Sequence, residues 1–486
     1  MNLTMLLDMA ADGFGDRVIV GTRTSGLTAV ALRDAAQRGA RLVADRGADA
    51  IVYTDVNGLG FPVAMFAAAY AGVPLVPLNY RLGAEQLDAL RARHPGAFVV
   101  GPGAGALPAQ DWLDVTTSTD PFDAVEPGYE DIPAVVIYTS GTTSEPKGVL
   151  LRHSNLVSYV FGSVEFASAG DDEAALMSVP PYHIAAVANV ITSLYAGRRL
   201  ITLERFDPQE WLALVRSEGV TNALVVPTML ARLLDVRGDR SLGRLRTLAY
   251  GGAPAPSSVV RKALETWPDL DFVNAYGLTE TSSTIAVLTP QDHRDVLASQ
   301  DPFVRARLGS VGRPLPGVQL EIRGPDGVPL GSGVPGRIWV AGDQVSAEYA
   351  GKGRQVDERG FFDTRDEGFL DEDGYLFIGG RTDDTIIRGA ENVAPAEIED
   401  VLMRHPAISD VAVVGLPDEQ WGQRIVAAVV LREGEEVDLE QLRDFARSTL
   451  RGSKTPEEIV IWSDLPRTET GKLVRRHVVD RFGAPV

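Results

Sequence analysis

A loop rich in hydroxyl groups and glycine is the strongest chemical signal in the sequence. Residues 138–148 read Tyr-Thr-Ser-Gly-Thr-Thr-Ser-Glu-Pro-Lys-Gly. Backbone N–H groups, hydroxyl donors and one ammonium are the groups that bind a polyphosphate. The loop does not follow the Walker A pattern, because Pro146 precedes Lys147 and Gly148 follows it. We therefore expect a phosphate-binding loop in a fold other than that of the P-loop NTPases.

Lysine is scarce in this chain, and two of its lysines lie in loops of this kind. The lysines are at positions 147, 262, 352, 454 and 472. The second such loop reads Pro-Arg-Thr-Glu-Thr-Gly-Lys and ends at Lys472. A compact ammonium on a flexible stem can follow a charge that moves during a reaction, which a rigid guanidinium fork cannot do. This distribution favours Lys147 and Lys472 as functional cations over chance remnants of an arginine-rich composition.

Further short motifs carry glycine, hydroxyl or carboxylate side chains. They are Pro-Pro-Tyr-His at 180–183, Gly-Gly-Ala-Pro at 251–254, Asn-Ala-Tyr-Gly-Leu-Thr-Glu at 274–280, Phe-Asp-Thr-Arg-Asp at 362–366, Gly-Gly-Arg at 379–381 and Arg-Gly-Ala-Glu-Asn-Val at 388–393. One such match alone is weak. A lone histidine such as His183 is more often a core or surface group than a ligand, but its place between a predicted strand and a helix of small residues favours a pocket.

Composition limits the classes of function. A chain of 486 residues exceeds what one hydrophobic core usually serves, so two or more domains are expected. The formal net charge of -20 argues against nucleic acid or an anionic membrane as partner, so an anionic ligand must be bound by local basic groups and backbone dipoles. The absence of cysteine excludes thiol nucleophiles, disulfides and cysteine-ligated metals.

One uncharged run, residues 61–78, is long enough to suggest a membrane span. Prolines and a glycine interrupt it, which instead predicts a buried helix over 63–71 and a strand over 73–78. The first residues lack the basic start of a signal peptide and soon reach Asp8. We therefore expect a cytoplasmic protein without a membrane span.

The elements that must position these motifs alternate between strand and helix in the first two thirds of the chain. Strands are predicted over 50–54, 73–78, 98–100, 134–138, 176–179, 199–203, 223–226 and 247–250, with helices over 207–218 and 257–266. Such alternation predicts a mostly parallel sheet with helices on its faces. The loop at 138–148 then lies at the carboxyl end of a strand, where open α/β sheets bind ligands.

The pattern changes after residue 309. Short β runs at 319–322 and 337–340 alternate with turns rich in glycine, aspartate and proline, which suggests a small barrel or sheet module. The last hundred residues read as a small α+β unit with helices over 395–403 and 439–450 and strands over 408–414 and 425–431. We predict a domain over 1–382 and a second over 383–486.

Taken together and in this order, the motifs resemble the adenylate-forming superfamily, which includes acyl- and aryl-CoA synthetases, peptide-synthetase adenylation domains and luciferases. The resemblance covers nearly the whole chain. It implies an α/β fold with a large N-terminal domain of mixed, mostly parallel sheets and helices, a small β-barrel module, a hinge near Asp383, and a small, mobile α+β C-terminal domain. It also implies ATP, Mg²⁺ and coenzyme A as cofactors or substrates.

The resemblance assigns nucleotide contacts by position. The implied phosphate contacts are Thr139, Ser140, Gly141, Thr142, Thr143 and Lys147, and the implied adenine and acyl loop is Gly252, Ala253 and Pro254 after Gly251. Asn274, Ala275, Tyr276 and Gly277 would lie at the adenine, Thr279 at the α-phosphate, Asp366 at the ribose, and Arg381 at the ribose or a phosphate. Glu280 and Thr142 would bind Mg²⁺, since a carboxylate is a hard oxygen ligand, and Gly389 would let a pantetheine arm pass close to the backbone.

The implied reaction has two steps. A carboxylate attacks the α-phosphate of ATP and pyrophosphate leaves; a thiol then attacks the acyl-adenylate. Lys472, Thr142, Glu280 and His183 would act in the first step by stabilising charge and placing the acid. The family rotates its small domain between the steps, so that the face around Gly389 would serve the second.

Three residues depart from the family pattern. Ala186 stands where many relatives have glycine, which would reshape the acid pocket. Arg365 replaces the usual glycine beside Asp366, and Ala390 replaces a second glycine near the thiol tunnel. We therefore expect this chain to differ from its family in the ribose loop and at the acceptor site.

The leading hypothesis is an AMP-forming acyl- or aryl-CoA ligase. No aspartate lies in 180–188 to hold an amino group, which disfavours an amino-acid substrate. An uncharged acid is expected from the pocket candidates, which are His183, Ala188, Asn189, Gly251, Ala275 and Thr281. A free-standing enzyme that loads an acyl carrier protein or another acceptor remains open. So does a non-catalytic nucleotide binder, although retention of Lys147, Glu280, Asp366 and Lys472 argues against it.

Overall fold

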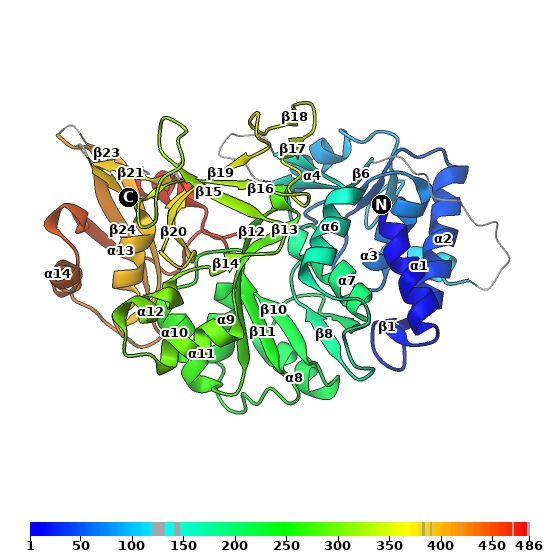
Figure 1. The fold of residues 1–486 in the computed structure, drawn as a ribbon, viewed down its shortest axis with the longest axis horizontal. Helices are drawn as coiled ribbons and strands as arrows, with labels where there is room; N and C mark the ends of the chain where they lie inside the picture. The colour runs from blue at the N-terminus through cyan, green and yellow to red at the C-terminus, as the bar shows by residue number, and fades with distance from the viewer. Residues whose placement is uncertain are drawn as a thin grey trace.

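The computed structural model describes residues 1–118, 132–139, 146–381, 384–388, 391–418, 420–468 and 471–483. A large N-terminal unit of sheets and helices fills most of the molecule, and a smaller C-terminal unit, orange to red in Figure 1, lies at one end. This arrangement confirms the predicted fold class. The predicted boundary at 382/383 falls outside the described residues and stays a prediction.

A nine-stranded sheet forms the centre of the large unit, in the order β14-β13-β12-β11-β10-β8-β9-β1-β2. Its strands are β1 Val18–Val20, β2 Leu27–Thr28, β8 Ala174–Met177, β9 Arg199–Thr202, β10 Asn222–Val225, β11 Thr247–Gly251, β12 Asp271–Leu278, β13 Ser283–Leu288 and β14 Arg313–Pro314. The run from β12 to β1 is parallel, and β13, β14 and β2 are antiparallel additions at the edges. The prediction of a mostly parallel sheet is confirmed here.

A second sheet has seven strands in the order β18-β17-β7-β6-β4-β3-β5. Its strands are β3 Ile51–Tyr53, β4 Leu75–Pro77, β5 Phe98–Val100, β6 Pro133–Thr139, β7 Lys147–Arg152, β17 Glu348–Tyr349 and β18 Gly353–Arg354. Strand β7 was not predicted. It pairs antiparallel with β6, so the loop predicted to bind phosphate joins the two strands of a hairpin.

Helices cover these sheets and join their cores (Figure 1). They are α1 Leu3–Phe14, α2 Ala29–Asp45, α3 Gly60–Ala71, α4 Ala84–Arg91, α5 Ala109–Thr116, α6 His153–Ser163, α7 Ile184–Ala196, α8 Pro208–Ser217, α9 Pro227–Leu234, α10 Ser257–Thr266, α11 Pro290–Ala298 and α12 Pro302–Ala306, with short 3₁₀ turns η1 Thr279–Thr281 and η2 Arg307–Gly309. One hydrophobic core contains residues of both sheets and of these helices. Helix α3 is buried all round, as its uncharged sequence predicts, and no described helix is long and apolar enough to cross a membrane.

The predicted barrel or sheet module is a four-stranded antiparallel sheet in the order β15-β16-β19-β20. Its strands are β15 Gln319–Arg323, β16 Gly336–Ala341, β19 Phe362–Leu370 and β20 Leu376–Arg381. Two small apolar clusters join it to β13 of the central sheet. Residues of β12 and β19 can therefore meet.

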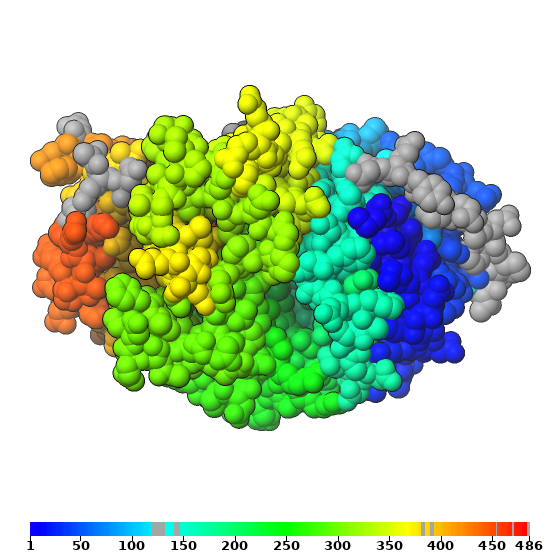
Figure 2. All heavy atoms as spheres, in the orientation of Figure 1, coloured from blue at the N-terminus to red at the C-terminus, as the bar shows by residue number. Residues whose placement is uncertain are grey.

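The C-terminal unit contains a hairpin, a three-stranded sheet and three helices. Its elements are β21 Ile386–Arg388, β22 Glu391–Val393, α13 Pro395–Leu402, β23 Ile408–Asp418, β24 Gly422–Leu431, α14 Leu439–Thr449, the turn η4 Gly452–Lys454, β25 Glu458–Ile461 and α15 Arg475–Gly483. Two apolar clusters on opposite faces of its sheet contain only residues of this unit. Figure 2 shows the unit packed against residues of the large unit at one end of the molecule.

Candidate functional site

The hairpin of β6 and β7 fixes the two ends of the predicted phosphate loop. Thr139 lies opposite Lys147 in the antiparallel register, and Tyr138 lies opposite Gly148. Residues 140–145 lie outside the described part of the chain. The roles predicted for Ser140, Gly141, Thr142 and Thr143 therefore stay predictions.

Glu280 lies in η1, directly after β12, and its carboxylate is held by a residue that the sequence did not single out. The Tyr349 hydroxyl donates to Glu280 Oε1 at 2.8 Å. Tyr349 belongs to β17, which pairs with β7, the strand that begins at Lys147. The tertiary structure thus links the predicted magnesium ligand to the base of the predicted phosphate loop.

The donor set around Glu280 fits Mg²⁺ better than a metal held by protein alone. The described residues contain no group of three or more histidine, aspartate or glutamate side chains that could hold a metal ion. Magnesium usually binds through one or two carboxylates together with substrate phosphates and water. A single oriented carboxylate near the base of the predicted phosphate loop is compatible with that mode of binding.

The backbone between β12 and β13 is tightly constrained. A Cβ atom on Gly277 would overlap the Ser283 carbonyl oxygen, so no larger residue fits there. Ser282 and Ser283 have φ of 56° and 110°, which for residues other than glycine stores strain of the kind found at functional sites. Thr281, a predicted pocket residue, is wholly buried, and its hydroxyl lies within hydrogen-bond distance of the Leu278 and Ser283 carbonyl oxygens, which stabilises this turn.

Tyr276 and Asp366, predicted at the adenine and at the ribose, lie in direct contact. The Tyr276 hydroxyl donates to Asp366 Oδ2 at 2.6 Å, and Asp366 is only 7% exposed. Asp366 also lies opposite Arg381 in the register of β19 and β20, although the Arg381 side chain is not among the described atoms. These predicted nucleotide contacts therefore come together from three strands.

Arg365, which stands where the family has glycine, adopts a left-handed conformation with φ of 61°. It lies in a bulge, because four residues of β19 span the distance that two residues of β16 span between Arg337 and Trp339. The Asp363 carboxylate accepts the Arg365 backbone N–H at 2.9 Å and stabilises this turn. Glycine adopts this left-handed conformation at a lower energetic cost. The backbone of Arg365 nevertheless adopts it, and the residue is exposed.

The loop after β11 is set by close backbone approach. A Cβ atom on Gly251 would overlap the Ala275 carbonyl oxygen on the neighbouring strand, and Gly252 has φ of 79°. Only glycine at positions 251 and 252 allows the backbone to follow this path from the end of β11 to Ala253 and Pro254. Asn274, predicted near adenine, donates its side-chain amide to the Ser310 carbonyl at 3.2 Å and so has a structural partner.

His183 is the N-cap of α7. Its Nδ1 accepts the backbone N–H of Ala185 at 3.2 Å. Burial of the ring, and then the nearby positive charge of Lys472, lower the pKa of His183 to about 4. At neutral pH the ring is therefore uncharged and carries its hydrogen on Nε2. The departure at Ala186 lies in the same helix, where the alanine is fully buried in the core.

Lys472 lies in a tight loop of the C-terminal unit that docks on the large unit. A Cβ atom on Gly471, which has φ of 76°, would overlap Thr228 Oγ1 at the start of α9. Within its own unit the loop is held by Arg467, which pairs with Asp410 through two nitrogens at 2.5 and 2.8 Å and donates to the Gly471 carbonyl at 2.6 Å. The docked loop places the Lys472 charge close enough to His183 to shift its pKa.

Sequence reasoning missed the residues that tie the site together. Tyr349 and Thr228 belong to no motif, and each lies far along the chain from the residue it contacts. The predicted Gly389, its neighbour Ala390 and the hinge residue Asp383 lie outside the described residues, so their roles remain predictions. Thr279 lies in η1 beside Glu280, as its motif requires.

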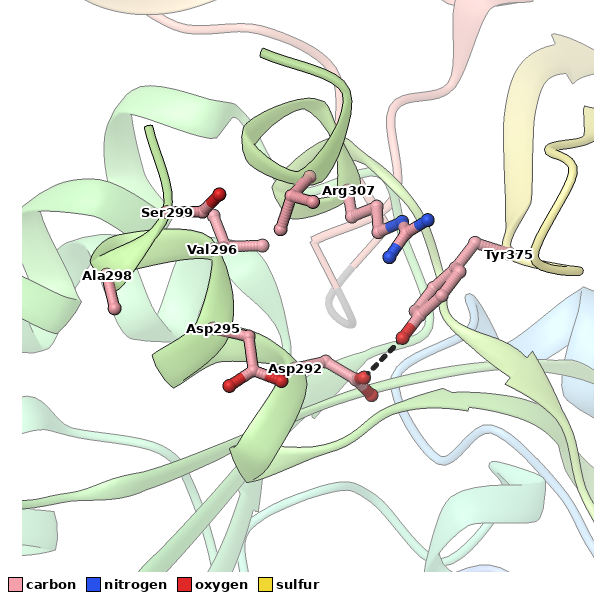
Figure 3. A pocket seen from close by; sticks show the side chains of 8 residues that line it. Asp292, Asp295, Val296, Ala298, Ser299, Arg307 and Tyr375 are labelled. Carbon is pink, nitrogen blue, oxygen red and sulfur yellow. Dashed lines mark hydrogen bonds between the residues drawn. The ribbon is translucent and has the colours of Figure 1, made fainter. Parts of the chain in front are cut away.

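A surface pocket of about 420 Å³ lies elsewhere, between α11, α12, η2 and Tyr375, the residue before β20 (Figure 3). Its lining includes Asp292, Arg307 and Tyr375, and the Tyr375 hydroxyl donates to Asp292 at 2.6 Å. Arg307 pairs with the carboxylates of Asp371 and Asp373. None of the predicted nucleotide contacts lines this pocket, so it is not part of the candidate site.

Comparison with known proteins agrees with the geometry. Residues 7–350 match the AMP-binding enzyme family, and residues 397–472 match the AMP-binding enzyme C-terminal domain. The chain is 33% identical over 462 residues to a feruloyl-CoA synthase of Amycolatopsis, covering 92% of this chain and 91% of that protein. It is 31% identical to a fatty acid–[acyl-carrier-protein] ligase of Streptomyces coeruleorubidus (89% and 87% covered) and 32% identical to a 2-succinylbenzoate–CoA ligase of Bacillus cereus (87% and 86% covered).

Solved structures share the whole architecture. The o-succinylbenzoate CoA synthetase of Bacillus subtilis, in complex with its acyl-adenylate, superimposes with a TM-score of 0.84 at 27% identity and covers 97% of each chain. The amide bond synthetase of Marinactinospora thermotolerans gives 0.85 at 27% identity and covers 99% of each chain. ATP-bound MatB from Rhodopseudomonas palustris gives 0.87 at 26% identity, again with 99% of each chain covered.

Proposed function

Because the chain belongs to the AMP-binding enzyme family of adenylate-forming ligases, we propose that it activates a carboxylic acid with ATP and transfers the acyl group to the thiol of coenzyme A. The observation that carries this proposal is the convergence of three groups from distant segments. Tyr349 orients the Glu280 carboxylate, Tyr276 is hydrogen-bonded to Asp366, and the docked loop of Lys472 brings its positive charge near His183.

In the first step a carboxylate oxygen of the acid bonds to the α-phosphorus of ATP, and the bond to the bridging oxygen breaks as pyrophosphate leaves. Negative charge develops on the phosphoryl oxygens and on pyrophosphate. The ammonium of Lys472, in the docked loop, would stabilise that charge. His183, neutral at pH 7, can donate its Nε2 hydrogen to the acid without adding a charge to the pocket.

Mg²⁺, when bound, would neutralise phosphate charge and hold the triphosphate in one geometry. Glu280 supplies the protein carboxylate for it, and Tyr349 keeps that carboxylate oriented. The Tyr276 hydroxyl fixes Asp366 so that the carboxylate can accept hydrogen bonds from ribose hydroxyls. These residues bind and orient; they need not exchange protons.

In the second step a thiol, which gives up its proton to solvent, bonds through sulfur to the acyl carbonyl carbon, and the bond from that carbon to the phosphate oxygen breaks as AMP leaves. Coenzyme A as acceptor is supported by relatives named as CoA ligases. Two other acceptors follow from named relatives: the thiol of an acyl carrier protein, and an amine. We place coenzyme A first because the two CoA ligases match at the higher identities.

The acid that we propose is uncharged apart from its reacting carboxylate. His183 is neutral, and the candidate lining at Ala188, Gly251 and Ala275 brings no charge into the pocket. An acid with a second carboxylate or an ammonium would need a counter-charge there. Aryl and acyl acids are therefore preferred over dicarboxylic and amino acids.

Acid-dependent exchange of pyrophosphate into ATP tests the first step. The panel includes ferulic, medium-chain fatty, 2-succinylbenzoic and amino acids. Exchange with at least one uncharged acid supports the proposal, and no exchange with any acid, by a folded protein with Mg²⁺ present, contradicts it. Product masses with coenzyme A, a phosphopantetheinylated carrier protein or an amine then identify the acceptor.

A further inference from the structure

Helix α10 begins without a capping side chain of its own, because the residue before it is Pro256. The missing acceptor comes from the other unit of the protein. Asp400 Oδ1 accepts the Ser257 hydroxyl at 2.8 Å and the Ser257 backbone N–H at 3.2 Å. The N–H groups of the first turn of a helix need such partners, and a carboxylate there also complements the helix dipole. A helix of the large unit is thus capped by α13 of the C-terminal unit.

Helix α10 connects this cap to the candidate site. It begins at Ser257, shortly after the loop 251–254 that leaves the end of β11. Any movement of the C-terminal unit away from α10 takes the acceptor away from Ser257. Burial disfavours the charged carboxylate of Asp400, but hydrogen bonds from Arg404 and Ser257 outweigh it and keep the pKa below its usual value. The cap is therefore charged at neutral pH.

Two ion pairs between the units are weaker than this contact. Arg237 pairs with Glu433 at 3.5 Å, with both side chains more than 90% exposed, and Arg432 lies 3.9 Å from Asp235. Exposed pairs of this kind contribute little because water screens them. The contact of Asp400 is shorter, partly buried and uses two donors.

We propose that Asp400 is a positioning residue that docks the C-terminal unit on α10 and thereby holds the Lys472 loop at the acid site for adenylation. The effect of Asp400 on adenylation rests on the proposed function, whereas its role in docking the two units is independent of that function. Removing the carboxylate shifts the balance toward arrangements in which the units are apart, which disfavours the first step and leaves the second unharmed.

The chain offers a matched control. Glu397 lies on the same helix, but its partner is Lys454, at 2.6 Å, within the C-terminal unit. Glu397→Ala removes one carboxylate from α13 without touching the contact to α10. Asp400→Asn keeps an oxygen acceptor, and asparagine caps helices about as well as aspartate. Asp400→Ala removes the acceptor.

The first test needs neither acid nor acceptor. Since the chain has no cysteine, Glu210→Cys and Glu436→Cys, both at exposed positions on different units, allow two spin labels to be attached specifically. Distances between the labels, measured by double electron–electron resonance, report docking. We expect Asp400→Ala to lower the ratio of docked to undocked protein about five- to tenfold, as for loss of one N-cap, and Glu397→Ala and Asp400→Asn to leave it unchanged. An unchanged distribution in Asp400→Ala overturns the proposal even if adenylation is established.

The second test separates positioning from stability. With an acid that supports pyrophosphate exchange, Asp400→Ala should lower the exchange rate about five- to tenfold, while transfer from the corresponding synthetic acyl-adenylate to coenzyme A is not lowered. A parallel loss of both half-reactions together with a lower Tm means that Asp400 is merely structural, and this contradicts the proposal. Recovery of exchange in Asp400→Asn supports it.

Discussion

Gly471→Ala tests the contact that places Lys472. The new Cβ atom would lie 2.9 Å from Thr228 Cγ2 and 3.0 Å from Thr228 Cβ, and would overlap Oγ1. Carbon atoms normally approach to about 3.5–4.0 Å, so the loop must retreat by about 1 Å. A misplacement of that size at a reacting centre costs on the order of 100-fold in rate. We therefore expect pyrophosphate exchange to fall about 100-fold.

The left-handed backbone adds a second effect that must be separated from the first. Gly471 has φ of 76°, and a side chain there costs about 1–2 kcal/mol of stability. Gly434→Ala supplies the control, because Gly434 has φ of 83° in the same unit and a Cβ atom there meets nothing within 4 Å. It should lose similar stability in urea unfolding but keep its exchange activity.

Thr228→Ala provides a rescue. It removes Oγ1 and Cγ2 and leaves only the contact at 3.0 Å, so the double variant with Gly471→Ala should recover part of the exchange rate. Equal activities of Gly471→Ala and Gly434→Ala would refute the reasoning. They would mean that the loop of Lys472 does not touch α9 when the acid is activated.

Three further predictions concern individual side chains of the site. The pKa of His183 is about 4 in the folded chain and about 6.5 in the unfolded chain, so the unfolded chain binds the proton more readily. The free energy of unfolding is therefore highest above pH 6.5 and falls by at most about 3 kcal/mol toward pH 4. His183→Gln should remove part of that fall, measured as the urea unfolding free energy at pH 7 and pH 5, and an identical fall would contradict the shift. Tyr349→Phe, which releases the Glu280 carboxylate, should raise the Mg²⁺ concentration for half-maximal exchange several-fold, with kcat at saturating Mg²⁺ nearly retained; an unchanged Mg²⁺ requirement would separate Glu280 from the metal. Tyr276→Phe leaves the buried Asp366 without one donor, so it should lower stability by about 1–3 kcal/mol and raise the KM for ATP but not that for the acid, and equal changes in both KM values would argue against a nucleotide contact.

Local sequence was sufficient for most of the secondary structure. The helix predicted over 257–266 and the strand over 98–100 have the predicted bounds, because turn residues and apolar periodicity mark both ends. The strand predicted over 176–179 is wrong by two residues; β8 ends at Met177, and the Ser178 hydroxyl instead accepts the Trp211 indole N–H at 2.9 Å. A side-chain contact with a distant helix is not visible in the local pattern.

Pairing between distant strands was the part that could not be predicted. Strand β7 pairs with β6 on one side and with β17 on the other, and β17 is only two residues long. Short edge strands carry little periodicity, so their existence depends on a partner that is already in place. The link from Tyr349 to Glu280 follows from that pairing alone.

The amino-acid order by itself determined which chemical groups are available: loops of glycine and hydroxyl residues, two lysines in loops, a Thr-Glu pair and an Asp near an Arg, in an order that identifies the family. Those properties depend only on residue types and their spacing along the chain, which are the same whether or not the chain is folded. Only the folded molecule decided which of them meet, since contacts such as Tyr276 with Asp366, Gly471 with Thr228 and Asp400 with Ser257 join residues from separate strands, helices and units. Packing of apolar faces, rather than any local motif, brings those pairs within reach.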